Sequence, residues 1–209
     1  MSIGKLYIIS APSGAGKTSL VKQLVANLTG LTVSISHTTR QMRSGEIDGQ
    51  DYYFVSVSEF QAMLDERAFL EYALVFDNFY GTAHQTVEEN LGKGLDVILE
   101  IDWQGAQQIK ALLPDSLAIF ILPPSIEILQ QRLRGRGQDD EQIIERRMRD
   151  AVAEMRHYDE FDYLVVNDVF EQALTELKHI IKANRLTRRR QQLVLRHLLS
   201  SLLLEPVQI

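Results

Sequence analysis

The sequence contains no cysteine among its 209 residues, which excludes disulfide bonds, thiol catalysis and thiolate metal sites and fits a reducing compartment. It also lacks any apolar stretch close to the ~20 residues that a membrane-spanning helix needs. The apolar run near the N-terminus, LYII, is too short for a signal peptide. We therefore expect a cytoplasmic protein with no membrane partner.

An excess of positive charge is missing as well. The formal net charge of −6 argues against general nucleic-acid binding, which normally appears as overall basicity. The histidines are scattered without the spacing of metal ligands, so we expect no histidine metal site. Positive charge is instead concentrated in one segment, so a local anion site is compatible with the acidic total. The arginines of this segment are Arg132, Arg134, Arg136, Arg146, Arg147 and Arg149.

Apolar runs rich in β-branched residues alternate with segments of helical periodicity, a pattern typical of an α/β protein with a mostly parallel sheet flanked by helices. The sequence has no internal repeat and no Gly/Ser linker, so we expect one domain. The predicted strands are residues 5–10, 31–36, 96–102, 117–122 and 163–167. The predicted helices are residues 16–28, 84–91, 103–112, 125–134, 139–156 and 169–187.

Two segments depart from this alternation. Residues 37–83 contain the turn-rich stretch RSGEIDGQD, then YYFVSV, a short helix that we expect Ser58 to open, and FLEYALVF; they predict a small β-rich insertion. The tail is basic from Arg185 and then apolar, which predicts one amphipathic helix. Packing of that helix against the body or a second copy of the chain is favoured over a membrane surface.

The stretch SAPSGAGKTSL directly follows the first predicted strand and is typical of a triphosphate-binding loop. Gly14 and Gly16 let the backbone curl around an anion, and the following helix adds the positive end of its dipole. Lys17 can reach the β- and γ-phosphates, and the Thr18 hydroxyl can join the Mg²⁺ shell as the metal-binding residue. Ala11 replaces the usual first glycine, which alanine tolerates if its φ stays negative. The expected nucleotide-binding residues are Ala11, Pro12, Ser13, Gly14, Ala15, Gly16, Lys17, Thr18 and Ser19.

A second binding site is indicated downstream, in SHTTRQMRSGEIDGQDYYF. Arg40, Arg43 and Tyr52 are suited to a phosphate monoester, because guanidinium groups form bidentate bonds to phosphate. Glu71 follows in FLEYA, and Tyr80 and Thr82 follow in NFYGT. Each of these residues alone would be an ordinary surface or core residue; their order behind a phosphate loop predicts an acceptor site.

The sequence closely resembles the guanylate kinases of bacteria. The segments quoted above, together with LEIDWQGAQQIK, FILPPS, RLRGRGQD and VVND, follow one another in the order of that family from residue 6 to about residue 168. The resemblance implies a P-loop nucleoside monophosphate kinase fold that transfers the γ-phosphoryl group of ATP to GMP with Mg²⁺, giving ADP and GDP. It also implies a division of the chain into a core, a GMP-binding insertion, an Arg-rich lid and a C-terminal helix. The core would be residues 1–35, 84–125 and 157–187, the insertion 36–83, the lid 126–156 and the C-terminal helix 188–209.

The resemblance also assigns residue roles by motif position. A carboxylate at Glu71 would accept both guanine N1–H and N2–H₂, whereas adenine presents a bare N1 acceptor there. Asp102 would contact guanine, organise Mg²⁺ water, or both; Glu100, where many relatives carry aspartate, stays outside the expected site. The GMP phosphate would be held by Arg40, Arg43, Tyr52 and Tyr80, and guanine by Ser36, Glu71, Thr82 and Asp102. The catalytic cations would be Lys17 and the lid residues Arg132, Arg136 and Arg147.

Two other functions share this scaffold. One is a kinase for another phosphorylated acceptor, against which Glu71 with Ser36 and Thr82 argues. The other is a non-catalytic guanylate-kinase-like domain that binds a phosphorylated protein, against which Lys17 and Thr18 argue. The expected partners are therefore small molecules, ATP and GMP, with a homo-oligomer left open.

Overall fold

The computed structural model describes residues 4–75, 77–135 and 141–203, and its centre is a five-stranded sheet in which every pairing is parallel. The strand order β2-β7-β1-β8-β9 places the first strand in the middle. Because all five strands run the same way, their carboxyl ends meet at one edge, where open α/β sheets bind ligands. The strands are β1 (Leu6–Ser10), β2 (Leu31–Val33), β7 (Asp96–Glu100), β8 (Leu117–Leu122) and β9 (Tyr163–Val166).

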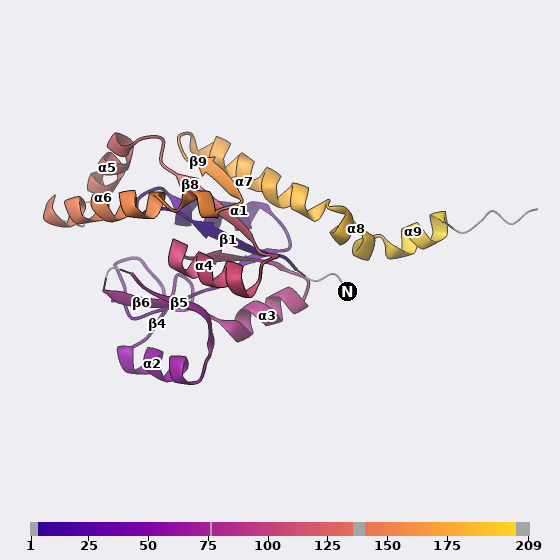
Figure 1. Cartoon of the computed structure of the whole chain (residues 1–209), viewed down its shortest axis with the longest axis horizontal. Helices are drawn as coiled ribbons and strands as arrows, with labels where there is room; N and C mark the ends of the chain where they lie inside the picture. The colour runs from indigo at the N-terminus through magenta and orange to yellow at the C-terminus, as the bar shows by residue number, and fades with distance from the viewer. Residues whose placement is uncertain (1–3, 76, 136–140, 204–209) are drawn as a thin grey trace, which may run out of the picture.

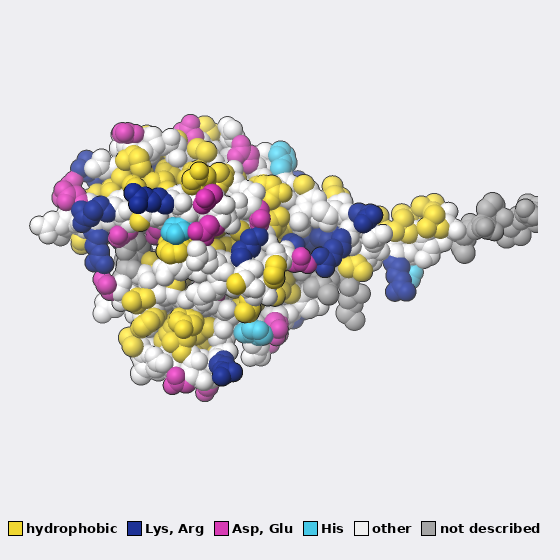
Figure 2. Space-filling view, in the orientation of Figure 1, with side chains coloured by type: hydrophobic (Ala, Val, Ile, Leu, Met, Phe, Trp, Pro, Cys, Tyr) yellow, Lys and Arg dark blue, Asp and Glu magenta, His cyan; other side chains and the backbone are white. Residues whose placement is uncertain are grey.

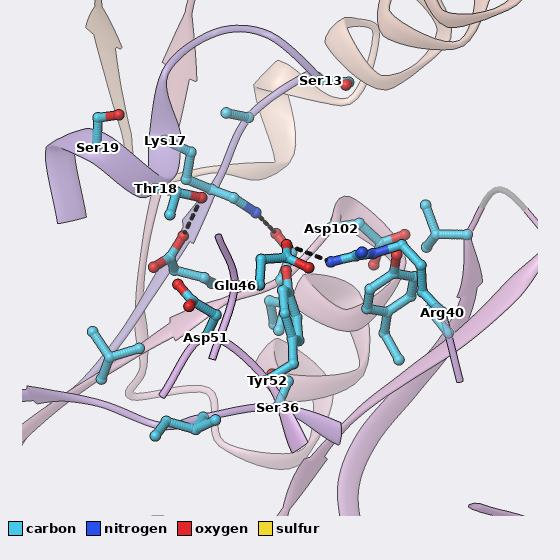
Figure 3. Close-up of a pocket in the computed structure, with 18 of the residues that line it drawn as sticks. Ser13, Lys17, Thr18, Ser19, Ser36, Arg40, Glu46, Asp51, Tyr52 and Asp102 are labelled. Atoms are coloured by element: carbon cyan, nitrogen blue, oxygen red, sulfur yellow. Dashed lines mark hydrogen bonds and ion pairs between the residues drawn. The ribbon is translucent and has the colours of Figure 1, made fainter. Parts of the chain in front are cut away.

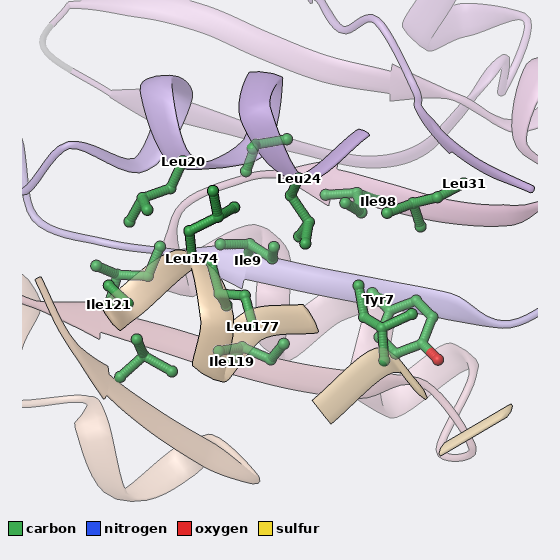
Figure 4. Packing of buried hydrophobic residues seen from close by; sticks show 14 of the residues in the cluster. Tyr7, Ile9, Leu20, Leu24, Leu31, Ile98, Ile119, Ile121, Leu174 and Leu177 are labelled. Atoms are coloured by element: carbon green, nitrogen blue, oxygen red, sulfur yellow. The ribbon is translucent and has the colours of Figure 1, made fainter. Parts of the chain in front are cut away.

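Helices cover both faces of this sheet, so the central strands are buried throughout. On one face, α1 (Lys17–Asn27) and α7 (Phe170–Arg185) pack on Tyr7 and Ile9 of β1 (Figure 4). On the other face, α3 (His84–Gly92) and α4 (Trp103–Leu112) pack on Ile8. Alternate residues of one strand thus belong to two cores, which fixes where β1 ends and the following loop begins.

The insertion forms a second, mixed sheet with strand order β4-β3-β6-β5, and it occupies the lower part of Figure 1 together with α2. Strands β3 and β4 pair in parallel and the other pairs are antiparallel. Phe60 of α2 stacks on Phe69 and Phe79 with ring centroids 4.5 and 5.4 Å apart, which anchors the helix on the sheet. The elements are β3 (His37–Thr38), β4 (Tyr53–Phe54), α2 (Val57–Asp65), β5 (Phe69–Val75) and β6 (Asn78–Ala83).

Helices α5 (Ile126–Gly135) and α6 (Glu141–Met155) form a separate pair with a small core of Leu129, Leu133 and Ile144. Figure 2 shows Lys and Arg side chains gathered over this pair. After α6, the 3₁₀ turn η1 (Tyr158–Glu160) leads into β9. The described arginines of the arginine-rich segment therefore lie on these two helices.

The α/β fold with a parallel sheet, flanking helices and a small β-rich insertion is confirmed, and two local predictions were wrong. The strand expected at residues 31–36 ends at Val33, because the chain then turns toward β3. Helix α2 is opened by Ser56, whose side chain forms a capping box with Glu59, and not by Ser58. Part of the helix expected at 139–156 lies outside the described residues.

The tail was expected to be one helix, and this was wrong. Two short helices, α8 (Arg188–Val194) and α9 (Arg196–Leu202), are separated at Leu195 and extend away from the body (Figure 1). Arg190 of α8 bonds the buried Asp96 carboxylate at 2.7 Å, which fixes the first helix to the sheet. In the described part of the chain, none of the helices has the length and apolar character needed to cross a membrane.

Candidate active site

A cavity of about 360 Å³ lies between the phosphate loop and the small sheet, next to the carboxyl ends of β1 and β7. Figure 3 shows Lys17 and Thr18 on one side of it and Arg40 reaching in from another. Residues predicted to bind the triphosphate and residues predicted to bind the second substrate therefore line the same cavity. Those that line it are Ala11, Pro12, Ser13, Gly14, Gly16, Lys17, Thr18, Ser19, Ser36, Arg40, Arg43, Tyr52, Glu71, Tyr80, Asp102 and Arg147.

Four predicted site residues are not among the lining. Ala15 and Thr82 are fully buried behind the cavity wall. Arg132 donates from Nη2 to the backbone oxygen of Asn167 at 2.8 Å, and its buried Nη1 has no hydrogen-bond partner among the described residues. Arg136 lies outside the described residues.

The phosphate loop depends on two glycines in the left-handed region, Gly14 and Gly16, both with φ of 93°. A Cβ on Gly16 would lie 2.5 Å from Nδ2 of Asn167, which donates to the backbone oxygen of Ala15 at 2.7 Å. Asn167 thus supports the loop from the end of β9; sequence reasoning quoted its motif, VVND, without giving it a role. Ala11 is not among the described non-glycine residues with positive φ, so alanine is tolerated there.

Lys17 and Thr18 begin α1 and point toward the end of β7. Lys17 Nζ donates to the backbone oxygen of Ile101 at 3.2 Å, and Thr18 Oγ1 donates to Glu100 Oε2 at 3.2 Å. Burial raises the pKa of Glu100, although the positive charge of Lys17 and the hydrogen bond from Thr18 act in the opposite direction. Glu100, left out by sequence reasoning, therefore lies in the cavity against the expected metal-binding residue.

This arrangement fits Mg²⁺ bound together with a phosphate. In the described parts of the chain, no group of three or more His, Cys, Asp or Glu side chains could hold a metal ion alone. Mg²⁺ usually takes one or two protein oxygens and completes its shell with water and substrate phosphates. The Thr18 hydroxyl and the Glu100 carboxylate provide such oxygens beside the loop.

The arginines of the acceptor side are oriented by a glutamate that sequence reasoning missed. Glu46 accepts from Arg40 Nη2 and from the backbone N–H of Arg43, both at 2.7 Å. Burial opposes ionisation of Glu46, and these two bonds prevail and lower its pKa. Arg40 also lies over the Tyr52 ring, 5.4 Å from its centroid, and Tyr52 packs edge-on against Tyr80. Arg40 and the two phenols thus form one cluster.

At the other end of the acceptor side lies a buried carboxyl, Glu71 of β5. Thr82 Oγ1 donates to Glu71 Oε1 at 2.5 Å, and Ser36 Oγ lies 3.4 Å from Thr82 Oγ1. Burial raises the pKa of Glu71 to about 7; Asp102 adds to the rise and Thr82 opposes it. A carboxyl with this pKa can exchange its proton near neutral pH when a ligand brings hydrogen-bond donors.

Asp102 follows β7 and caps α4. Its Oδ1 accepts from the backbone N–H of Gly105 at 2.9 Å and its Oδ2 accepts from Gln104 Nε2 at 3.1 Å. Gly105 also lies close to the buried carboxyl of Glu71, because a Cβ there would lie 2.5 Å from Glu71 Oε2. The first turn of α4 therefore lies against two of the acidic side chains that line the cavity, Asp102 and Glu71.

Another lining residue that sequence reasoning missed is Glu154, which enters the cavity from α6. It lines this cavity together with Ser13 of the phosphate loop, and burial raises its pKa to about 7. The available signal was its spacing from Arg147: seven residues are about two helical turns, which puts both on one face of α6. Sequence reasoning weighed only the arginines of that helix.

A phosphate loop at the carboxyl edge of a parallel sheet, facing a small sheet that carries arginines and a buried carboxyl, defines a P-loop kinase acting on a small phosphorylated acceptor. Residues 3–184 match the protein family described as guanylate kinase. The guanylate kinase of Methylococcus capsulatus is 57% identical over 203 residues, 97% of this chain and 100% of that protein. That of Escherichia coli is 56% identical over 194 residues, 92% of this chain and 94% of its own.

A solved structure agrees with the sequence relatives. The crystal structure of guanylate kinase from Anaplasma phagocytophilum superposes with a TM-score of 0.77 at 32% identity and covers 90% of each chain. The chain belongs to the guanylate kinase family.

Proposed function

We propose that the cavity holds ATP and GMP side by side and that the residues named above carry the roles described here. As a guanylate kinase, the chain transfers the γ-phosphoryl group of ATP to GMP, giving ADP and GDP. The observation that supports the residue roles most strongly is the placement of Glu71 and the phosphate loop on one cavity. A buried carboxyl beside Thr82 and Ser36 suits guanine, and the loop suits a triphosphate.

The donor half of the site consists of the loop from Ala11 to Ser19 with Lys17. Its backbone N–H groups and the N-terminus of α1 hold the phosphates, while Lys17 leaves the Ile101 oxygen for the more strongly charged phosphate oxygen. Thr18, with Glu100 beside it, would hold Mg²⁺, which supplies positive charge at the phosphates.

The acceptor half binds GMP at both its phosphate and its guanine ring. Glu46 holds Arg40 beside Tyr52 and Tyr80 and accepts from the backbone N–H of Arg43, so the GMP phosphate meets Arg40 and the two phenols already assembled. Guanine N1–H and N2–H₂ donate to Glu71, with Ser36, Thr82 and Asp102 around the ring. Adenine would leave the ionised Glu71 without those donors, and this disfavours AMP.

Transfer itself needs positioning and positive charge more than a base, because the GMP phosphate is already anionic at neutral pH. Lys17 and Arg147 line the cavity, and Arg132 and Arg136 belong to the same arginine-rich segment. These four cations stabilise the charge that spreads over the transferred group. We assign the segment 126–156 as the lid, 36–83 as the GMP-binding insertion and 188–209 as a C-terminal extension of the core.

The function is tested by a coupled ADP-release assay with ATP, Mg²⁺ and one of GMP, AMP, CMP or UMP. We expect turnover that depends on GMP and is at least about 100-fold weaker with AMP. Equal rates with GMP and AMP would show that Glu71 does not select guanine. A lack of turnover with all four nucleoside monophosphates would contradict the acceptor site.

Two further properties belong to the same proposal. We expect a cytoplasmic enzyme, in keeping with its cysteine-free sequence. We also expect a homo-oligomer that buries the apolar side chains of α9, among them the exposed Leu198 and Leu202. Light scattering on the full chain and on a chain ending at Thr187 compares the two masses, and equal monomer masses would contradict this role of the tail.

A further inference from the structure

Helix α4 lies against β5 of the small sheet (Figure 1), and the side-chain amide of Gln108 binds the backbone of that strand at Tyr72. Gln108 Oε1 accepts from the Tyr72 N–H at 3.2 Å, and Gln108 Nε2 donates to the Tyr72 carbonyl oxygen at 2.8 Å. In the described part of the chain, β5 is the last strand of its sheet, so this edge of its backbone faces α4 and not another strand. The amide carries both a donor and an acceptor and takes the place of a neighbouring strand there.

Strand β5 is irregular immediately before this contact. Its pairing with β6 shifts register between Phe69 and Glu71, as in a β-bulge. Residues two apart in a regular strand face the same side, but here Phe69 stacks on Phe60 of α2 at 4.5 Å, whereas Glu71 faces the cavity. The register shift therefore turns Glu71 toward the cavity. The Tyr72 N–H that Gln108 binds belongs to the peptide group directly after Glu71.

Helix α4 is itself fixed to the main sheet. Ala106 and Ile109 are buried in the core on one face of that sheet, next to Gln108 along the helix. One turn before Gln108, a Cβ on Gly105 would lie 2.5 Å from Glu71 Oε2. The helix thus meets Glu71 twice, at its carboxyl through Gly105 and at its backbone through Gln108.

We propose that Gln108 is a positioning residue that determines specificity: its amide holds β5 directly after the register shift and keeps Glu71 aligned with guanine. The inference rests on the proposed guanine-reading role of Glu71. Gln108 is not among the residues that line the cavity, so it acts through the strand and not on the nucleotide. Glu71 belongs to the insertion and Asp102 follows a strand of the main sheet, and the bond between Gln108 and Tyr72 holds these two parts in register.

The test compares kinetic constants in the coupled ADP-release assay with ATP, Mg²⁺ and GMP. Gln108→Met removes both bonds and keeps the length of the side chain. Gln107→Met, at the next residue of the helix, is the matched control, because Gln107 bonds Glu160 and not β5. We expect Gln108→Met to raise the KM for GMP about threefold to tenfold, with kcat within about twofold of the wild type and the KM for ATP unchanged. Gln107→Met should match the wild type in all three constants.

Selectivity separates positioning from a general loss of structure. Adenine brings no donors to Glu71, so displacement of this carboxyl weakens the use of GMP more than the use of AMP. We expect the ratio of kcat/KM for GMP to that for AMP to fall about threefold to tenfold in Gln108→Met. Gln108→Glu keeps the acceptor for the Tyr72 N–H and places an oxygen against the Tyr72 carbonyl, so it should lower the ratio as well.

Hydrogen exchange of the Tyr72 amide shows whether the contact itself is lost. We expect faster exchange in Gln108→Met and the wild-type rate in Gln107→Met. Faster exchange together with a wild-type KM for GMP would overturn the proposal, and so would a loss confined to kcat or shared equally by GMP and AMP. Unchanged exchange would show that Gln108 does not hold β5 and would overturn it too. Absence of GMP-dependent turnover in the wild type would instead refute the proposed function.

Discussion

Glu71 and Thr82 face each other on the neighbouring strands β5 and β6, and the Thr82 hydroxyl donates its single hydrogen bond to Glu71 Oε1, 2.5 Å away. The Thr82 oxygen can then only accept from Ser36, so Ser36 Oγ is the donor across their 3.4 Å contact. This chain of donors ends on Glu71 and leaves its second oxygen, Oε2, beside Gly105. One direction of hydrogen bonding thus runs through the guanine-reading side of the cavity.

GMP affinity should fall as the pH falls through 7. The pKa of Glu71 in the empty protein is about 7, and the guanine donors require the ionised form. At pH 6 about nine in ten molecules would carry the proton there, so the wild-type Kd for GMP should be about tenfold weaker than at pH 8. Calorimetry checks this, with Glu71→Gln as the control: it should bind GMP about 100-fold more weakly and without this pH step.

Glu71→Gln should at the same time stabilise the fold at high pH. The pKa of Glu71 in the folded state, about 7, lies above the ordinary value of 4.5 for a glutamate side chain. The unfolded chain therefore loses the proton more easily, and stability declines as the pH rises from about 4.5 to 7. At pH 8 the variant should gain about 1–3 kcal/mol in the free energy of unfolding, and near pH 4 the gain should vanish. Urea unfolding of the wild type and the variant at pH 8 and pH 4 measures this difference. If the variant is no more stable than the wild type at pH 8, burial of the Glu71 charge does not cost stability.

Gly105→Ala should weaken GMP binding although Gly105 is expected to make no contact with GMP. Its Cβ would lie 2.5 Å from Glu71 Oε2, so the carboxyl must move. We expect a KM for GMP raised about tenfold, with the KM for ATP nearly unchanged. Gly92→Ala is the matched control, since nothing among the described residues lies within 4 Å of a Cβ there. If both variants keep the wild-type KM, Glu71 tolerates displacement and its placement is not what selects GMP.

Lys17→Ala should remove turnover and leave GMP binding in place. Lys17 belongs to the donor half of the cavity, and loss of a positioned cation at a charged transition state costs about 10²–10³-fold in kcat. Calorimetry with GMP and the coupled assay with ATP measure the two halves separately. Lys93→Ala, at an exposed lysine after α3, is the control. Complete loss of GMP affinity in a folded Lys17→Ala protein would contradict this division of the site.

Arg132→Ala should lower kcat by about 100-fold with little change in the KM for GMP. The buried Nη1 of Arg132 has no hydrogen-bond partner among the described residues, and the proposed role requires it to turn from the side of Asn167 toward the transferred phosphoryl group. Arg134→Ala is the control, because Arg134 is exposed on the same helix and pairs with Glu141. A change in KM alone would show that Arg132 acts on bound GMP and not on the transition state.

The features that could be predicted from the sequence are those that a local pattern of residues determines. The central strands are short apolar runs between breakers, and the loop between Ala11 and Ser19 carries its own glycines, so both could be located directly. Chemistry suggested a phosphate site at Arg40, Arg43 and Tyr52, but the role of Glu71 came only from the family motifs. Nothing in the order of Arg40 and Glu71 along the chain says that they share one cavity.

Two of the residues that sequence reasoning left without a role act across long separations. Asn167 supports the loop at Ala15, which lies 152 positions earlier in the chain, and Glu100 accepts from Thr18, 82 positions away. Such contacts depend on how β9 and β7 pack in the sheet and leave no local pattern. Glu46 differs, because it lies only six and three positions from Arg40 and Arg43, where sequence reasoning weighed the cations alone.

The central claim is that the terminal phosphoryl group of ATP passes directly to GMP in this cavity. The most direct measurement follows ATP labelled in its γ-phosphate during incubation with Mg²⁺ and GMP, with the products separated by chromatography. The account predicts that the label appears as the β-phosphate of GDP, in step with unlabelled ADP, and that omission of GMP stops the reaction. Label released as inorganic phosphate, or label retained in ATP while GMP is bound, would contradict it.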